Sequence, residues 1–252
     1  MTDPIALITG GSRGLGRNAA LHLARQGTGV IITYLSRADE AAAVVKEIQA
    51  LGGKAAALQL DIGNTAQFTD FADRLAEALE REWGRGTFDY LVNNAGMGIN
   101  AAFADTTEEQ FDTLMNVHVK GVFFLTQRLL PLIADGGRIL NVSSGLARFS
   151  LPGYAAYATM KGAIEVLSRY LAKELGPRGI AVNVIAPGAI ETDFGGGAVR
   201  DIADVNAFVA GNTAMGRAGL PDDIGGAVAS ILLGDNQWMT AQRIEVSGGM
   251  FL

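Results

Sequence analysis

The sequence predicts an α/β protein built on a doubly wound parallel sheet of about seven strands, with helices on both faces. Short apolar runs alternate with longer helical patterns from one end of the 252 residues to the other. Two of the runs, 30–34 and 180–185, are almost continuously apolar, as expected for parallel strands buried on both faces. Because no Pro- or Ser-rich linker divides the chain, we expect a single domain over 1–252.

The elements follow from these patterns in chain order. Apolar runs predict strands over 5–9, 30–34, 55–60, 88–92, 137–142, 180–185 and 243–246. Helical spacing of apolar residues predicts helices over 15–26, 38–51, 65–83, 107–117, 119–133 and 156–175. Gly52-Gly53 closes the second helix and Gly176-Pro177 the last one, because glycine ends helices and proline cannot continue them.

The irregular section 191–215 follows the sixth strand and contains Gly195-Gly196-Gly197. In a sheet of this kind, ligands bind beyond the carboxyl ends of the strands. A section with a glycine hinge at that place predicts a substrate lid.

Composition excludes several classes of protein. Hydrophobic residues make up 49% of the chain and charged residues 18%, which excludes a disordered chain. The net charge of −6, without a block of Lys or Arg, argues against nucleic acid and membrane surfaces as partners. The chain has no Cys, and His22 and His118 lack metal-ligand spacing, so we expect no metal site. No signal peptide and no run of ~18 apolar residues is evident, and we expect a cytoplasmic protein.

A glycine-rich loop follows the first expected strand. Residues 9–16 are Thr-Gly-Gly-Ser-Arg-Gly-Leu-Gly. Gly10 allows a sharp turn, Gly14 allows the backbone to approach a phosphate, and Gly16 allows the next helix to pack closely on the sheet. The helix that starts near Gly14 presents free N–H groups and its positive dipole end, so the loop predicts a pyrophosphate site. Its Gly-x-x-x-Gly-x-Gly spacing differs from the Gly-x-Gly-x-x-Gly of the common dinucleotide fingerprint.

Tyr157 and Lys161 lie four residues apart in an expected helix, so both side chains share one face. A free phenol has a pKa near ~10, and acid/base catalysis near neutrality requires a pKa about 3 units lower, or ~4 kcal/mol. A unit charge about 4 Å away, at an effective dielectric constant of ~20, supplies ~4 kcal/mol. Lys161 can therefore activate Tyr157, although the pair alone favours a half-buried packing tyrosine.

The chain carries further motifs on the expected elements, in the order Asn93-Asn94-Ala95-Gly96, Asn116, Ser143-Ser144, Pro187-Gly188 and Thr192. Together with the loop 9–16 and the Tyr157/Lys161 pair, they resemble the motifs of the short-chain dehydrogenase/reductase family, in its compact single-domain branch. The resemblance covers essentially the whole chain. It implies a Rossmann-like fold and hydride transfer between a nicotinamide cofactor and a carbonyl or secondary alcohol substrate.

The resemblance implies a role for each member of a catalytic tetrad, Asn116, Ser144, Tyr157 and Lys161. Tyr157 would exchange a proton with the substrate oxygen, which Ser144 would hold by a hydrogen bond. Lys161 would lower the pKa of Tyr157 and bind the nicotinamide ribose, and Asn116 would hold a water molecule that links Lys161 to solvent. The implied cofactor contacts are Gly10, Ser12, Arg13, Gly14, Leu15, Gly16, Tyr34, Ser36, Arg37, Asp61, Ile62, Asn93, Ala95, Gly96, Tyr157, Lys161, Pro187, Gly188, Ile190 and Thr192.

The end of the second expected strand indicates which nicotinamide cofactor binds. Residues 33–37 lack the acidic residue that would bind the adenosine ribose and repel a 2′-phosphate. Arg13 and Arg37 can pair with such a phosphate, which favours NADP(H) over NAD(H), although both could be solvated surface cations. Asp61 resembles the adenine-contacting aspartate of the family. The alternative role for Asp61 is to cap the following helix.

Alternative functions remain open at this point. Tyr154 precedes Lys161 by seven residues, a spacing that resembles enoyl reductases of the same superfamily, but the loop 9–16 does not match theirs. We therefore interpret Tyr154 as a wall of the substrate pocket. A non-catalytic NADP-binding sensor or regulator, or a purely structural protein, would use the same fold. The complete tetrad favours an enzyme, a carbonyl reductase similar to 3-oxoacyl reductases.

The pocket and the assembly are predicted only in outline. Residues that could line the pocket or belong to the core are Met97, Leu146, Phe149, Phe194 and Met215. The absence of a basic patch disfavours an acyl-carrier-protein partner. Since members of the family are usually tetramers or dimers, we expect a homotetramer, with the apolar end 247–252 in an interface.

Overall fold

The computed structural model describes residues 3–252, and within them all paired strands run parallel in a seven-stranded sheet. The strands are β1 (Ile5–Ile8), β2 (Gly29–Tyr34), β3 (Ala55–Gln59), β4 (Phe88–Asn93), β5 (Ile133–Val142), β6 (Ala181–Pro187) and β7 (Arg243–Val246). Their order in the sheet is β3-β2-β1-β4-β5-β6-β7. The direction of strand addition reverses between β1 and β4, which places a ligand-binding crevice at their carboxyl ends.

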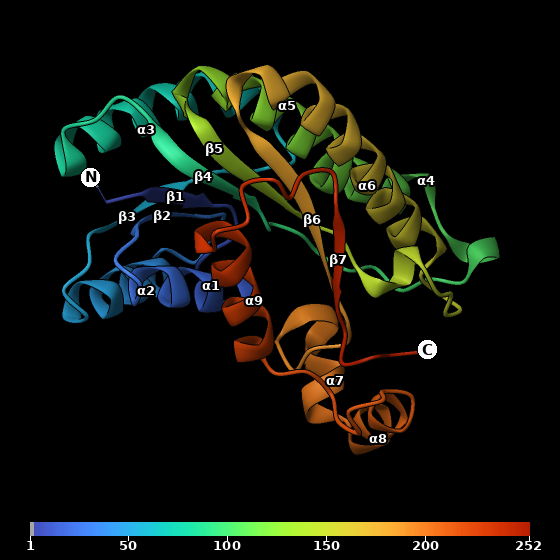
Figure 1. The fold of residues 1–252 in the computed structure, drawn as a ribbon. Coiled ribbons are helices and arrows are strands. Elements are labelled where there is room, and N and C mark those ends of the chain that lie inside the picture. Colours follow the sequence, from blue (N-terminus) through green and yellow to red (C-terminus); the bar gives the residue numbers. More distant parts are fainter. Residues whose placement is uncertain (1–2) are drawn as a thin grey trace.

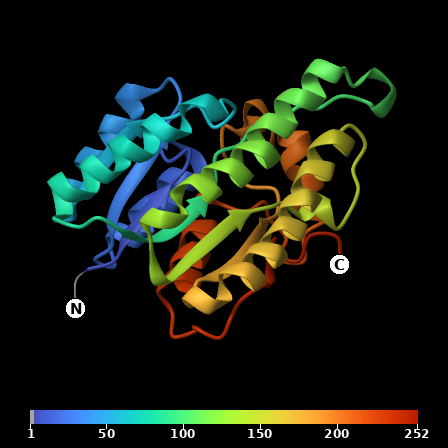
Figure 2. The same cartoon turned by 90° about the horizontal axis from the view of Figure 1, so that it is seen from above.

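Helices cover both faces of this sheet (Figures 1 and 2). One face carries α1 (Gly14–Ala24), α2 (Ala38–Ala50) and α9 (Pro221–Leu233). The other carries α3 (Phe68–Trp83), α5 (Gly121–Leu129) and α6 (Ala155–Leu175), and α4 (Glu108–Met115) precedes α5. The short helices α7 (Ala198–Asp201) and α8 (Ala203–Gly211) lie beyond the sheet, near the C-terminus (Figure 1). The predicted doubly wound fold is confirmed, with α9 as a helix that was not among those expected.

Two apolar cores form, one on each face of the sheet. Successive residues of a strand point to opposite faces, so Leu7 and Ile31 enter one core while Ile8 and Ile32 enter the other. All four side chains are buried. At roughly 25 cal/mol per Å² of buried apolar surface, these cores supply the main stabilisation of the sheet on which the site is built.

The two helices expected over 107–117 and 119–133 are joined into one run, and the predicted break between them is wrong. A π turn over Asn116–Lys120 connects α4 with α5, and the N–H of Gly121 donates to the carbonyl of Asn116. The run ends at Leu129, earlier than expected, because Pro131 lies in a 3₁₀ turn. The fifth strand therefore begins at Ile133 instead of residue 137. Within residues 3–252, no helix is long and apolar enough to cross a bilayer.

Gly121 permits the close approach of the π turn to the segment after β3. A methyl group on Gly121 would overlap the carbonyl oxygen of Ile62, so we expect Gly121→Ala to destabilise the fold by about 1–3 kcal/mol. Gly226→Ala in α9 is the matched control, because its methyl group would lie at an ordinary distance, 4.0 Å from Cε1 of His22. This control should gain about 0.4–1 kcal/mol. Urea unfolding of both variants tests the difference, and a stabilised Gly121→Ala would contradict it.

Candidate active site

The carboxyl ends of β1 and β4 are joined by hydrogen bonds that shape the glycine loop. Thr9 Oγ1 accepts from the N–H groups of Asn94 (3.0 Å) and Ala95 (2.9 Å). Asn94 Nδ2 donates to the carbonyl oxygens of Thr9 (2.9 Å) and Gly10 (3.1 Å). A methyl group on Gly16 would overlap the Gly10 carbonyl and Asn94 Nδ2, so glycine is required there. Sequence reasoning did not assign Thr9 or Asn94 a function, although both belong to motifs that it recognised.

The loop fits a pyrophosphate group. Helix α1 begins at Gly14, and among the described residues its N-cap, Arg13, makes no side-chain cap and its first turn holds no acid. The first N–H groups of the helix therefore remain available to an anion. Gly14 has φ +55°, and a methyl group there would meet only Thr192 Cβ, at 4.0 Å. The structure thus leaves room beside the backbone of the loop and brings Thr192 next to it.

Of the other residues predicted to contact the cofactor, some lie at the same crevice and others direct their side chains away from it. At or beside the carboxyl ends of the central strands lie Ser12, Leu15, Tyr34, Ser36, Ala95, Gly96, Pro187, Gly188 and Ile190. The side chains of Asn93 and Ile62 point into the interior, where Asn93 Nδ2 donates to Thr126 Oγ1 (3.1 Å) and Asn141 Oδ1 (2.8 Å). Asp61 Oδ1 accepts from the N–H of Gly63 (2.9 Å) and forms a local turn.

The predicted catalytic residues come together where β5 ends and α6 begins. Ser144 lies close enough to the phenol of Tyr157 to lower its pKa. Lys161 Nζ donates to the carbonyl of Val142 (2.8 Å) and lies 5.5 Å from the centroid of the Tyr157 ring. Asn116 lies at the start of the π turn, which packs against α6. The arrangement can hold an oxygen atom of a ligand beside a buried phenol.

The comparisons with known proteins agree with this geometry. A family model described as enoyl-(acyl carrier protein) reductase matches residues 10–251. An uncharacterised oxidoreductase from Methylorubrum extorquens is 39% identical over 98% of this chain and 97% of its own length. The reductase LugOII, which catalyses keto-reduction at C1 in lugdunomycin biosynthesis, is 38% identical with a TM-score of 0.94, over 100% of this chain and 99% of that one. The angucycline C-6 ketoreductase LanV, solved with bound NADP, is 36% identical with a TM-score of 0.94, over 99% and 96% of the chains.

The chain belongs to the short-chain dehydrogenase/reductase family. The predictions of family, fold class and an oxidoreductase are thereby confirmed. The assignment of individual catalytic and cofactor residues stays a prediction, which the geometry makes specific enough to test.

Burial controls the protonation of the tyrosine–lysine pair of this family member. Burial raises the pKa of Tyr157, and the hydrogen bond with Ser144 opposes that shift. Burial also lowers the pKa of Lys161, to about 7. The expectation that Lys161 lowers the pKa of Tyr157 stays a prediction, and in this structure Lys161 Nζ donates to the Val142 carbonyl (2.8 Å). Tyr157 therefore keeps its proton at neutral pH, whereas Lys161 titrates close to neutrality.

Two aromatic residues outside the tetrad contact the ring of Tyr157. His118 meets it edge to face at 5.3 Å between centroids, and Phe194, from the section 191–215, lies 5.9 Å away. Burial lowers the pKa of His118 to about 3, so its neutral ring donates from Nε2 to the Met97 carbonyl (2.7 Å). The sequence indicated a structural role for His118, and this contact gives it one beside the phenol.

The buried lysine predicts a pH-dependent stability. Lys161 has a pKa of about 7 in the folded protein and 10.5 as a free side chain, so between these values the unfolded chain binds more protons. The stability of the wild type should therefore rise with pH across this window, by up to about 1.4 kcal/mol per pH unit. Lys161→Met lacks this contribution, and its stability relative to wild type should fall as the pH rises from about 7 to about 9. Urea unfolding without cofactor measures the free energy of unfolding of both proteins at each pH. Lys173→Met on the same helix is the control for the loss of a lysine. If the stability difference between Lys161→Met and wild type did not change with pH, the prediction would be contradicted.

Proposed function

We propose that this chain reduces ketones with NADPH, and that Tyr157 is the proton donor. The observation that carries the proposal is the placement of Ser144 and Lys161 beside the phenol of Tyr157, at the edge of the dinucleotide crevice. Two solved relatives at 36–38% identity, LugOII and LanV, are ketoreductases, which supports the same chemistry here.

Each side chain of the tetrad has a separate role in the proposed reduction. NADPH supplies the hydride when it is bound. Ser144 holds the carbonyl oxygen of the substrate, and Tyr157 gives that oxygen a proton as negative charge develops on it. Because burial raises the pKa of Tyr157, the phenol keeps its proton until it faces an alkoxide, which is a stronger base than a phenolate. Lys161, which titrates near neutrality, then returns a proton to Tyr157, and solvent would reprotonate Lys161 through a water molecule held by Asn116 at the π turn.

The surroundings of the adenosine end favour NADP(H). Arg13 and Arg37 flank the ends of β1 and β2 without an acidic residue on the strand end itself. Arg37 Nη1 donates to Glu40 Oε1 (2.8 Å), but the side chains are 58% and 32% exposed. Since exposed pairs contribute about 0–1 kcal/mol, Arg37 can exchange Glu40 for a 2′-phosphate at little cost. The NADP bound to LanV supports this preference, and NAD(H) is the weaker candidate.

Ketone reduction fits the geometry better than enoyl reduction. The family model carries the description of an enoyl reductase, and Tyr154 has the matching distance in sequence from Lys161. However, Ser144 lowers the pKa of Tyr157, while Tyr154 lines an apolar cavity of about 310 Å³ with Leu146 and Phe103. Tyr154 thus acts as the pocket wall that the sequence suggests. No similarity reported above favours the alternative of a non-catalytic sensor.

We further propose that residues 1–252 form a single domain in which the section 191–215 closes over the substrate. Three consecutive glycines, Gly195 to Gly197, have φ values of +62°, +76° and +79°. Only glycine adopts such a run without strain, which makes the segment suited to a hinge. Phe194 already contacts the Tyr157 ring, so movement of this section would open or cover the phenol.

We also propose that the protein is a homotetramer or a homodimer and that it is located in the cytoplasm. The outer faces of α5 and α6 expose Phe123 (43%), Phe124 (43%), Val166 (46%) and Tyr170 (65%). An apolar patch of this kind is typical of a protein interface. Light scattering at micromolar concentration measures the mass, and a monomer would contradict the assembly.

Replacement of Tyr157 tests the reaction directly. Titration with NADPH and NADH first establishes binding, with NADPH expected to bind more tightly. Turnover is then measured with a panel of ketones. Tyr157→Phe should lower kcat by about 10²–10⁴-fold with little change in NADPH affinity, because only the proton donor is lost. Tyr154→Phe is the matched control and should keep kcat within about tenfold; the reverse pattern would favour enoyl reduction, and tight NADPH binding without any turnover would favour the sensor.

A further inference from the structure

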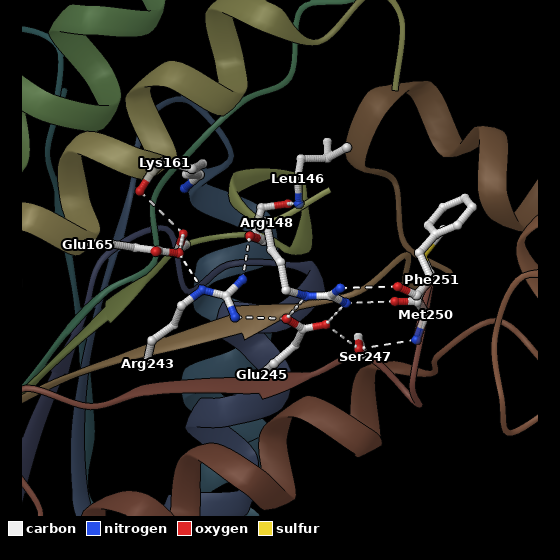
Figure 3. A network of polar contacts seen from close by, with 11 residues as sticks. Leu146, Arg148, Lys161, Glu165, Arg243, Glu245, Ser247, Met250 and Phe251 are labelled. Atoms are coloured by element: carbon white, nitrogen blue, oxygen red, sulfur yellow. Dashed lines mark hydrogen bonds and ion pairs between the residues drawn. The ribbon is translucent and has the colours of Figure 1, made fainter. Parts of the chain in front are cut away.

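Four charged side chains form a connected cluster beside β7 and the serine loop 143–148 (Figure 3). We call Arg148, Glu165, Arg243 and Glu245 the C-terminal polar cluster. Three of them are largely withdrawn from solvent, with side chains 15% (Glu165), 24% (Arg243) and 19% (Glu245) exposed. Removal of one partner from such a pair is costly, because the other charge is left desolvated. The cluster is therefore more than a set of surface ion pairs.

Arg243 is the centre of this cluster and donates to three different segments. Its Nε donates to Glu165 Oε1 on α6 (2.7 Å), and its Nη1 to Glu245 Oε2 on β7 (2.8 Å). Its Nη2 donates to the carbonyl oxygen of Ser144 (3.3 Å). One guanidinium thus connects β7, the catalytic helix and the serine loop (Figure 3). Its planar fork of donors suits it to hold three acceptors at fixed angles.

Two of the three acceptors adjoin the tetrad. Glu165 follows Lys161 by four residues, on the same face of α6. Glu165 Oε1 also accepts from Ser143 Oγ (2.8 Å), and Ser143 directly precedes Ser144. Arg243 consequently contacts both sides of the gap between the serine loop and α6. Ser144 on the serine loop and Tyr157 on α6 lie near each other across this same gap.

We propose that Arg243 is a positioning residue, which fixes Ser144 against the helix that carries Tyr157 and Lys161. The proposal rests on the ketone reduction proposed above. Arg243 holds the Ser144 backbone through its carbonyl, while the Leu146 N–H donates to Ser144 Oγ (3.2 Å) from the other side. A serine held at both ends keeps its hydroxyl in one place relative to the phenol.

The outer part of the cluster supports Arg243 from behind. Arg148 donates twice to Glu245 (2.6 and 2.8 Å) and to the carbonyl oxygens of Met250 (2.7 Å) and Phe251 (3.1 Å). The hydrogen bond from Arg148 lowers the pKa of Glu245 to about 2, so Glu245 stays charged and attracts Arg243. The end of the chain is in this way tied to the active site through two arginines.

Arg243→Met tests the proposal, with Arg178→Met as the matched control. Arg178 makes a comparable set of bonds at the opposite end of β5, to Asp135 (2.7 Å) and to the carbonyls of Leu130 (2.9 Å) and Ile133 (2.5 Å). With NADPH and a ketone that the wild type reduces, Arg243→Met should lower kcat by about 10- to 100-fold, the size expected for a displacement of about 1 Å. KM and the Kd for NADPH should stay within about twofold, and Arg178→Met should keep kcat within about twofold.

Arg243→Lys and amide hydrogen exchange separate positioning from general loss of structure. Arg243→Lys keeps the charge opposite Glu165 but cannot reach three acceptors, and it should recover part of kcat. The rate of amide hydrogen exchange should increase within residues 143–148 in Arg243→Met, and within residues 130–135 in Arg178→Met. Equal loss of kcat in both methionine variants, or unchanged exchange at 143–148, would overturn the positioning role. If the wild type reduces no ketone, the proposed function fails, and the exchange measurement still decides whether Arg243 holds the serine loop.

Discussion

The hydrogen bonds between Thr9 and Asn94 are the constraint on which the rest of the site depends. They join β1 to β4 where the order of the sheet reverses, so they connect the glycine loop to the half of the protein that carries the tetrad. A crevice at this point is a property of all doubly wound sheets. Its width here is set by the paired donors and acceptors of two side chains, which apolar packing alone would not specify.

A second set of polar contacts sets the orientation of α6. Apolar burial holds the helix against the sheet, but it is non-directional and does not fix rotation about the helix axis. Three consecutive residues at the end of β5 fix this rotation by hydrogen bonds to α6. Asn141 donates to Ser168 (2.8 Å), and Val142 accepts from Lys161 (2.8 Å). Ser143 donates to Glu165 (2.8 Å). The rotation of α6 that directs Tyr157 toward Ser144 follows from this register.

The sequence was sufficient for the strands, because buried parallel strands are continuously apolar and their ends coincide with glycine, proline or polar residues. It placed β7 at 243–246, as observed. It failed at the π turn, because the extra residue of that turn shifts the helical period, and such a shift resembles a break between two helices. Arg243 belongs to no motif, and its contacts Glu165 and Ser144 lie 78 and 99 residues away in the chain, so only the fold brings them together.

The protonation of the tetrad also depends on the fold. One buried environment favours the neutral form of every group, which raises the pKa of an acid and lowers that of a base. Sequence spacing indicated only the effect of Lys161 on Tyr157. Burial, which the spacing does not reveal, raises the pKa of Tyr157 and lowers that of Lys161. Burial therefore retains on Tyr157 the proton that the proposed reduction of a ketone needs.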